Sequence, residues 1–293
     1  MEVKEASIKD NNQRDVLLKL FNVHVPSGDR AWREHRHSQF EIVLFKSGSG
    51  KYTTANAVYS IQKGDVFVFS SNEEHCITKI DDREEMILMN LHFEPRYFWG
   101  TGNDSFSDSN LFFSHQKTFQ NRLNRGDDAA KIIARLLLEI EKEFLEKPPE
   151  FRISVRAKVI EILLTLIRQT NYYAPGQKGT GANILPVKNA IEYIHSHLTE
   201  PLKLADIAAN ANLSASYFST VFKTVIGTGV WDYITQKRLE KAMRMLETDS
   251  STTMLEIALQ CGFNNTANFN KAFRAHIGKT PREYRAIGKS ALY

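Results

Sequence analysis

The chain has 293 residues, of which 42% are hydrophobic and 25% charged, and its formal net charge is +4. This length is enough for two domains, and the composition excludes a disordered chain. The opening, MEVKEASIKD, lacks the apolar run of a signal peptide, and no apolar stretch predicts a membrane span. Cys76 and Cys261 are expected to be free thiols in a reducing compartment, so we expect a cytoplasmic protein with no membrane partner.

The positive charge is concentrated at one end of the chain. Residues 183–293 contain 13 Lys and Arg against 9 Asp and Glu, so this part carries the whole excess of +4. Such a distribution favours an anionic partner for this end alone. Because the excess is small, chance is the alternative explanation.

Up to about Phe93 the sequence predicts short strands. Four runs of β-forming residues, separated by Gly, Ser and Asn, are typical of a barrel or sandwich: VLLKLFNVHV, QFEIVLFK, GDVFVFS and EMILMNLHF. A loop rich in Gly, Asp, Ser and Asn is predicted for residues 100–110.

Two helices are predicted after the strands, at about 128–147 and 151–172, separated by Pro148 and Pro149. The first has a core stripe, with Leu138 and Leu145 off it. Both helices have more apolar residues than one stripe requires. They either pack against the barrel or form an antiparallel pair that builds a dimer interface. Residues 173–183, YAPGQKGTGAN, have the composition of a flexible linker.

The last third contains an internal repeat. The same pattern begins at Phe218 and again at Phe269, 51 residues later. It consists of two Phe four residues apart, a Gly five residues after the second Phe, and a Tyr six residues after the Gly. An Ile-Ala pair precedes each copy. Such a repeat indicates one supersecondary unit used twice.

Each copy is predicted to be a helix, a short turn and a second helix, with Ser214 and Asn265 as N-caps of the second helices. The Phe pair of each second helix faces the core. Small and polar side chains on the other face suit base edges in a DNA major groove, and a basic residue in each copy suits a phosphate. These candidates for DNA contact are Ala215, Ser216, Ser219, Thr220 and Lys223 in the first copy, and Thr266, Ala267, Asn270, Lys271 and Arg274 in the second.

Between the copies, Val230 to Glu247 contains no helix breaker and predicts a helix about 25 Å long. A rigid spacer of that length can hold two recognition helices near the ~34 Å separation of successive major grooves. The alternative is an α-helical bundle whose solvent-exposed face happens to be polar.

Residues from about 184 to the end resemble the DNA-binding domain of the AraC/XylS family of bacterial transcription regulators. The second copy, IALQCGFNNTANFNKAFRAHIGKTPREYR, carries the family pattern of Ile-Ala, Gly-Phe, spaced Phe, Gly, Thr-Pro and Tyr-Arg. The resemblance implies two helix-turn-helix motifs, joined by a long helix, in adjacent major grooves of double-stranded DNA. Many members carry arginine where Thr220 stands, so bidentate guanine recognition is not implied for the first copy.

In the first half, HRHSQFEIVLFKSG places His35, His37 and Glu41 on one face of a strand, and GDVFVFSSNEEH adds His75. Three imidazoles and a carboxylate form a plausible set of ligands for Fe, Mn, Ni or Zn. The alternatives, which we favour over metal, are hydrogen bonds to an organic ligand or polar positions at a barrel mouth. Trp32 is a candidate stacking surface for a ring, or a core residue.

The same segments resemble the two motifs of the cupin barrel, although Ser70 and Asn72 replace the usual Pro and Gly. Cupin-like sensor domains of this family bind sugars or other small metabolites and usually work without metal. We therefore expect no cofactor, and the candidates for effector contact are Trp32, His35, His37, Glu41 and His75.

The expected fold is an α+β multidomain chain: a cupin-like effector-binding and dimerisation domain at 1–172 (barrel about 1–100), a linker at 173–183 and an all-α DNA-binding domain at 184–293. The expected protein is a homodimeric transcription regulator, an activator that contacts RNA polymerase and responds to a small molecule such as a carbohydrate. The rival readings are a metal-dependent cupin oxygenase or isomerase, and a nucleoid-type binder without sequence preference.

Overall fold

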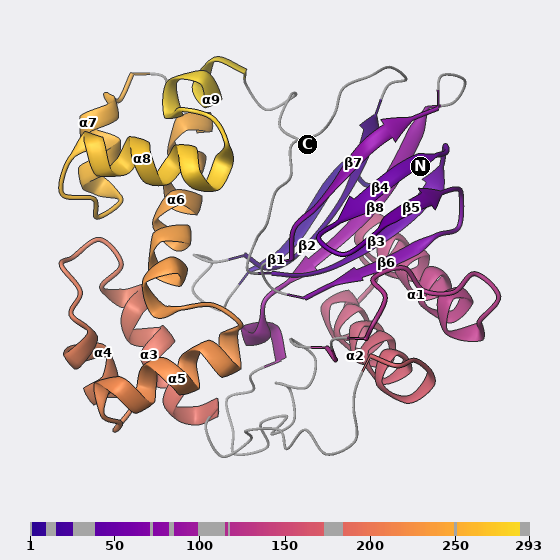
Figure 1. The fold of residues 1–293 in the computed structure, drawn as a ribbon, viewed down its shortest axis with the longest axis horizontal. Coiled ribbons are helices and arrows are strands. Elements are labelled where there is room, and N and C mark those ends of the chain that lie inside the picture. The colour runs from indigo at the N-terminus through magenta and orange to yellow at the C-terminus, as the bar shows by residue number, and fades with distance from the viewer. Residues whose placement is uncertain are drawn as a thin grey trace. The chain divides into compact units, whose positions relative to one another are not determined.

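The protein is described from a computed structural model for residues 2–9, 16–25, 39–70, 73–81, 85–98, 115–116, 118–172, 184–248 and 251–287. The chain divides into two compact units, residues 1–181 and 182–293 (Figure 1). The predicted linker and the predicted loop at 100–110 lie outside the described residues. Among the helices within the described ranges, none has the length and apolar character needed to cross a membrane.

The strands of the first unit form two antiparallel sheets. The larger has the order β1-β2-β8-β3-β6 and the smaller the order β5-β4-β7. The strands are β1 (Glu5–Lys9), β2 (Val16–Val25), β3 (Phe40–Ser47), β4 (Gly50–Thr54), β5 (Val58–Ile61), β6 (Val66–Phe69), β7 (His75–Ile80) and β8 (Met86–Phe93). Side chains alternate across β3, so Glu41, Val43 and Phe45 face one side of the large sheet, and Phe40, Ile42 and Leu44 face the other.

The expectation of a closed barrel needs correction, because no hydrogen-bonded ladder joins the two sheets in the described part of the chain. The sheets instead bury their inner faces against each other, with Phe45 and Phe67 of the large sheet packed against Tyr52 of the small one. The outer edge of β6 pairs with residues 121–123, where Val68 N donates to Asn121 O (2.9 Å) and Leu123 N donates to Val66 O (2.9 Å). That pairing occupies the edge that barrel closure would require.

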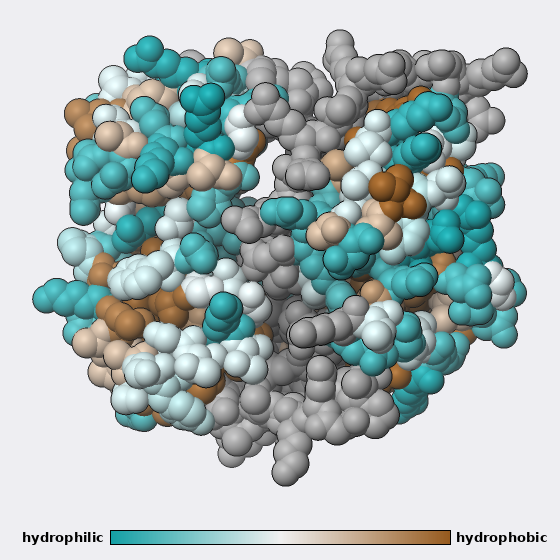
Figure 2. Space-filling view, viewed as in Figure 1, coloured by the Kyte–Doolittle hydropathy of each residue, from teal (hydrophilic) through white to brown (hydrophobic). Residues whose placement is uncertain are grey.

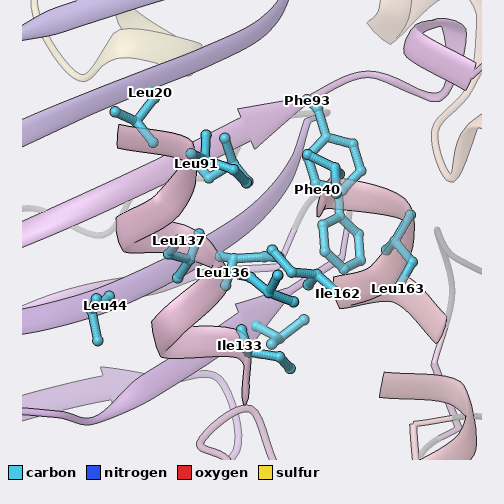
Figure 3. Packing of buried hydrophobic residues seen from close by; sticks show 14 of the residues in the cluster. Leu20, Phe40, Leu44, Leu91, Phe93, Ile133, Leu136, Leu137, Ile162 and Leu163 are labelled. Carbon is cyan, nitrogen blue, oxygen red and sulfur yellow. The ribbon is translucent and has the colours of Figure 1, made fainter. Parts of the chain in front are cut away.

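Two helices, α1 (Asp128–Glu146) and α2 (Phe151–Gln169), pack on the other face of the large sheet. Leu136 and Leu137 of α1 and Ile162 of α2 meet Phe40 and Leu91 from the strands (Figure 3). The predicted core stripe of α1 is largely buried, with Ile132 half-buried and the other five members buried: Ile133, Leu136, Leu137, Ile140 and Phe144. A short 3₁₀ turn, η1 (Pro95–Phe98), follows β8.

The described part of the second unit is helical throughout. Its helices are α3 (Ile184–Ser196), α4 (Leu204–Asn210), α5 (Ala215–Ile226), α6 (Val230–Thr248), α7 (Met254–Gln260), α8 (Thr266–Ile277) and α9 (Pro281–Ile287). The pairs α4–α5 and α7–α8 are the two predicted helix-turn-helix motifs, and α6, 19 residues and about 28 Å long, joins them. The predicted α+β layout of a β-rich first unit and a helical second unit is confirmed.

Candidate nucleic-acid interface and effector site

The first recognition helix, α5, is fixed at both ends and along one face. The Ser214 side chain accepts from Tyr217 N, which caps the first turn, and Gly227 ends the helix in the left-handed conformation (φ 79°). Phe218 and Phe222 are fully buried, with ring centroids 5.5 Å apart. The apolar side of α5 is thereby anchored, and its polar side is left to solvent.

The second recognition helix, α8, is built in the same way. The Asn265 side chain accepts from Asn268 N at 2.8 Å, and Gly278 ends the helix at φ 74°. Phe269 and Phe273 are fully buried. Both predicted N-caps and the predicted use of the Phe pairs are confirmed.

The turns inside the two motifs use the same backbone geometry with different residues. In the first motif Asn212 has φ 54°, and in the second Gly262 has φ 86°. Asn is the side-chain-bearing residue that adopts this left-handed region most easily, whereas glycine adopts it freely. At Gly262 space matters as well, because an added Cβ would lie 2.8 Å from Leu198 O.

The ten residues predicted to contact DNA lie on the outward faces of α5 and α8. Seven are exposed: Ser216, Thr220, Lys223, Ala267, Asn270, Lys271 and Arg274. Ala215, Ser219 and Thr266 are half-buried. In Figure 2 the surface over α7 and α8 is mostly strongly hydrophilic, whereas much of the surface over α3 to α5 is near neutral.

Hydrogen bonding differs between the two faces. On α5 the Ser219 hydroxyl donates to Ala215 O (2.9 Å), and the Thr220 hydroxyl donates to Ser216 O (3.3 Å). On α8, no residue in the described ranges bonds to the side chains of Asn270, Lys271 or Arg274. The polar groups of α8 are therefore free to bind a partner, whereas the central hydroxyls of α5 already donate within their own helix.

The helix between the motifs, α6, is held to the start of the unit. The Arg238 guanidinium donates to Leu198 O and to Glu200 O, both at 2.8 Å, and His195 Nε2 lies 2.8 Å from the Tyr233 hydroxyl. Burial lowers the pKa of Arg238. These bonds fix α6 against α3 and the segment after it, so contacts along its side stabilise the spacer in addition to its own helical hydrogen bonds.

In the first unit, three predicted effector residues, Trp32, His35 and His37, lie outside the described residues. The other two come together between the sheets. Glu41 of β3 lies 2.9 Å from His75 of β7, measured from Oε2 to Nε2. Its other oxygen, Oε1, lies 3.2 Å from His92 Nε2 on β8.

His92 was missed in the sequence. It pairs with Glu41 across neighbouring strands, and only the register of β3 against β8 shows this. Polar residues at 90 and 92, alternating with Leu91 and Phe93, were the one available signal of a polar patch on this strand.

The pKa of His75 reflects two opposed effects. Burial is the larger single influence and lowers it, but the charge and hydrogen bond of Glu41, with the Glu73 carbonyl at 2.9 Å, outweigh burial and raise the pKa overall. The pair is therefore stabilised as an ion pair between the sheets. Aromatic rings flank it: Phe69 stacks on His75 at 4.1 Å, and Phe21 meets His92 edge-on at 4.9 Å.

A second His–Glu pair lies beside this cluster. The Glu73 carboxylate accepts from the Ser70 hydroxyl, from His115 Nε2, and from Asn121 Nδ2 at 2.5 Å. The backbone of Gln116, next to His115, donates to Tyr172 O at 3.0 Å. The network thus connects the start of β7 to the last described residue before the predicted linker.

Neither cluster forms a metal site within the described ranges, where no group of three or more His, Cys, Asp or Glu has the arrangement of metal ligands. The metal alternative also required His35 and His37, which lie outside those ranges. A surface groove of about 420 Å³ lies between residues 118–129 and the end of α2. Glu41 and His75 do not line it, so the groove and the buried cluster are separate features.

Comparison with known proteins gives matches in both units. Residues 26–163 match a family model described as an AraC-like ligand binding domain, and residues 207–287 match a helix-turn-helix domain model. The chain is 23% identical over 267 residues to the probable transcriptional regulator LumQ of Photobacterium leiognathi, covering 91% of this chain and 97% of LumQ. It is 24% identical to an uncharacterized HTH-type transcriptional regulator of Staphylococcus aureus strain MSSA476, covering 93% of this chain but 34% of that protein. The chain thus spans about a third of that relative.

Among solved structures, ToxT from Vibrio cholerae has a similar fold, with a TM-score of 0.59 at 14% identity, covering 92% of this chain and 99% of ToxT. That structure holds ToxT bound to (E)-4-(8-methylnaphthalen-1-yl)but-3-enoic acid. The matched models and relatives describe transcriptional regulators rather than enzymes. With a ligand-binding domain followed by paired helix-turn-helix motifs, the chain belongs to the AraC family of transcriptional regulators.

Proposed function

We propose that this protein binds a specific double-stranded DNA operator through α5 and α8 and changes that binding when a small molecule occupies its first unit. The observation that carries the proposal is the duplicated, capped helix with a buried Phe pair and an outward polar face. Two such helices in one DNA-binding domain, residues 184–293, allow one chain to read two successive major grooves.

The ten outward residues divide into two roles. Ala215, Ser216, Ser219 and Thr220, and their counterparts Thr266, Ala267, Asn270 and Lys271, lie towards the N-terminal part of each helix, where a recognition helix contacts base edges. Lys223 and Arg274 lie one turn further on, both exposed, and are proposed to contact phosphates.

The effector is proposed to bind at Glu41, His75 and His92. Trp32, His35 and His37, which lie outside the described residues, stay candidates for effector contact from the sequence. A carboxylate and imidazoles can bond to hydroxyl groups, and the rings of Phe21 and Phe69 offer apolar faces. This chemistry suits a carbohydrate. A different class, an amphipathic carboxylic acid, is suggested by the ligands named for ToxT, one of which is an unsaturated fatty acid.

We further propose that the protein is a homodimer through α1 and an activator that contacts RNA polymerase, acting in the bacterial cytoplasm where its DNA is found. Leu138 and Leu145, seven residues apart on α1, are 46% and 37% exposed and face away from the core of the unit. An effector regulates such a dimer only through different affinities for its two arrangements.

The test is selection of bound fragments from random duplex DNA with the full chain, followed by competition of the selected site against random duplex at fixed salt. A specific regulator binds the selected site at least about 10³-fold more tightly. Equal affinity for both would support a nucleoid-type binder and overturn the proposal. A thermal-shift screen with sugars and unsaturated fatty acids then tests the effector, with Glu41→Gln as the variant expected to lose the shift.

A further inference from the structure

The two recognition helices present opposite hydrogen-bonding chemistry at their central positions. Aligned on the Phe pairs, Ser219 corresponds to Asn270 and Thr220 to Lys271. In α5 both residues are hydroxyls, whereas in α8 they are an amide and an ammonium group. The two motifs therefore share a fold, but the surfaces proposed to face DNA carry different side chains.

The protons of three α5 hydroxyls already form hydrogen bonds within the helix. Ser219 donates to Ala215 O at 2.9 Å, Thr220 to Ser216 O at 3.3 Å, and Thr224, one turn on, to Thr220 O at 2.9 Å. A hydroxyl has one proton and two acceptor lone pairs, so a hydroxyl that donates to its own helix presents only lone pairs to a partner. Turning the proton to a base acceptor would break that bond.

Ser216 is the exception on this face. The residue four positions before it, Asn212, precedes the helix, so Ser216 has no carbonyl of α5 to receive its proton. It lies at the end of the helix, however, and the two central positions remain an acceptor pair with the methyl group of Thr220 beside them.

The α8 face, in contrast, carries donors that form no hydrogen bond within their own helix. Lys271 has three donor protons and no acceptor, and Asn270 has two donor protons and one acceptor oxygen. Both are exposed, and no residue in the described ranges bonds to either side chain. In the major groove, guanine offers two acceptors, N7 and O6, to a donor such as lysine, and adenine matches an Asn amide.

We propose that the two helices read opposite base chemistry: Ser219 and Thr220 of α5 accept from the amino group of adenine or cytosine and contact the thymine methyl, whereas Lys271 of α8 donates to guanine. The operator is then asymmetric within each subunit's site, and its asymmetry fixes the direction in which one chain lies along the duplex. This inference rests on the proposed function, because it requires α5 and α8 to lie in major grooves.

The test uses the full chain and the operator recovered by selection. Repeating the selection with Thr220→Val and with Lys271→Ala identifies the half-site under each helix, because each variant relaxes the preference in its own half. Thr220→Val keeps the methyl group and removes the hydroxyl, so shape is preserved.

Base analogues then separate the two chemistries. Replacing guanine by 7-deazaguanine removes the N7 acceptor, and replacing adenine by purine removes the amino group. In the α8 half, 7-deazaguanine should weaken binding on the order of 10-fold, and this loss should vanish in Lys271→Ala. In the α5 half, purine should weaken binding by several-fold, and this loss should vanish in Thr220→Val.

Thr220→Arg adds donors at the acceptor position and should create a new guanine preference in the α5 half. A guanine N7 dependence in the α5 half of the unmodified protein, or a purine effect unchanged by Thr220→Val, would overturn the inference while leaving specific binding intact. If selection enriches no sequence over random duplex, the proposed function itself fails.

Discussion

At the scale of single residues, position 262 requires glycine for two reasons, one conformational and one steric. Its φ of 86° is left-handed, and a Cβ there would lie 2.8 Å from Leu198 O and 2.9 Å from Thr199 Cα, both backbone atoms that cannot rotate away. The turn of the second motif is thereby packed directly on the segment after α3. The corresponding Asn212 is exposed and shares only the conformational requirement.

Gly262→Ala should therefore lower the free energy of unfolding of the second unit by about 2–4 kcal/mol, the sum of left-handed strain and overpacking. Asn212→Ala, the matched control, adds no clash and should cost about 1 kcal/mol. Denaturant unfolding monitored by circular dichroism compares the two. A loss at Gly262 no greater than that at Asn212 would show that the close approach has no energetic effect.

The proposed phosphate contact of Arg274 is also a residue-scale prediction. Arg274→Ala should weaken binding by a similar factor on every duplex and reduce the slope of log K against log salt by about 1, because one fewer counterion is released. Titration by fluorescence anisotropy at four salt concentrations measures the slope. Arg282→Ala, on α9, is the control for loss of an exposed arginine in the same unit. An unchanged slope in Arg274→Ala would remove it from the phosphate contacts.

At the scale of elements, the Glu73–His115 pair links the segment before α1 to the segment before β7. Burial, the largest influence on His115, lowers its pKa, but the hydrogen bond and charge of Glu73 outweigh it and raise the pKa. For Glu73, burial raises the pKa, and the bonds from His115, Ser70 and Asn121 outweigh it and lower it. The ion pair therefore stabilises the folded state fully at pH values between about 4.3 and about 6.5, the pKa values of Glu and His in the unfolded chain.

As pH rises through the raised pKa of His115, that stabilisation is lost. His115→Gln should therefore destabilise the first unit by about 1–2 kcal/mol at pH 6 and by clearly less at pH 8.5. His24, whose pKa is also raised but whose side chain is 49% exposed, supplies the control His24→Gln, with little effect at either pH. Thermal melting at the two pH values measures both. An equal loss for His115→Gln at pH 6 and 8.5 would contradict the ion pair.

An element could be predicted when its sequence carried a strong hydrophobic or capping pattern. The helices of the second unit carry caps, Phe pairs and breakers, and the strands β2, β3, β6 and β8 are rich in apolar, β-forming residues. The strands β1, β4, β5 and β7 were not identified individually, because runs such as EASIK and GKYTT contain few apolar residues. Their pairing partners, rather than their own propensity, make them strands.

At the scale of the whole molecule, the two candidate sites differ in whether their residues come from one element or from several. The proposed DNA-contact face lies within single helices, so spacing along the chain was enough to predict that its ten residues share the outward sides of α5 and α8. The polar cluster of the first unit is assembled from β3, β7 and β8, and only strand register brings His92 to Glu41. Sequence spacing specifies neighbours along a helix, but it does not specify which strands pair across a sheet.

The proposed dimer gives the last prediction. The double variant Leu138→Asp, Leu145→Asp places two charges on the exposed face of α1, and a charge buried in an apolar interface without a partner is unfavourable. Sedimentation velocity should therefore show monomers. In a dimer, binding of the first subunit raises the effective concentration of the second, which increases affinity for an operator with two sites by roughly 10²–10⁴. The monomeric variant should lose this gain on DNA that carries two sites and not on DNA that carries one. Val58→Asp, at a side chain 63% exposed on β5, is the matched control and should stay dimeric. Binding to a single site, which only α5 and α8 of one chain contact, should change less than about twofold in either variant. A double variant that remains dimeric would exclude this face of α1 as the interface.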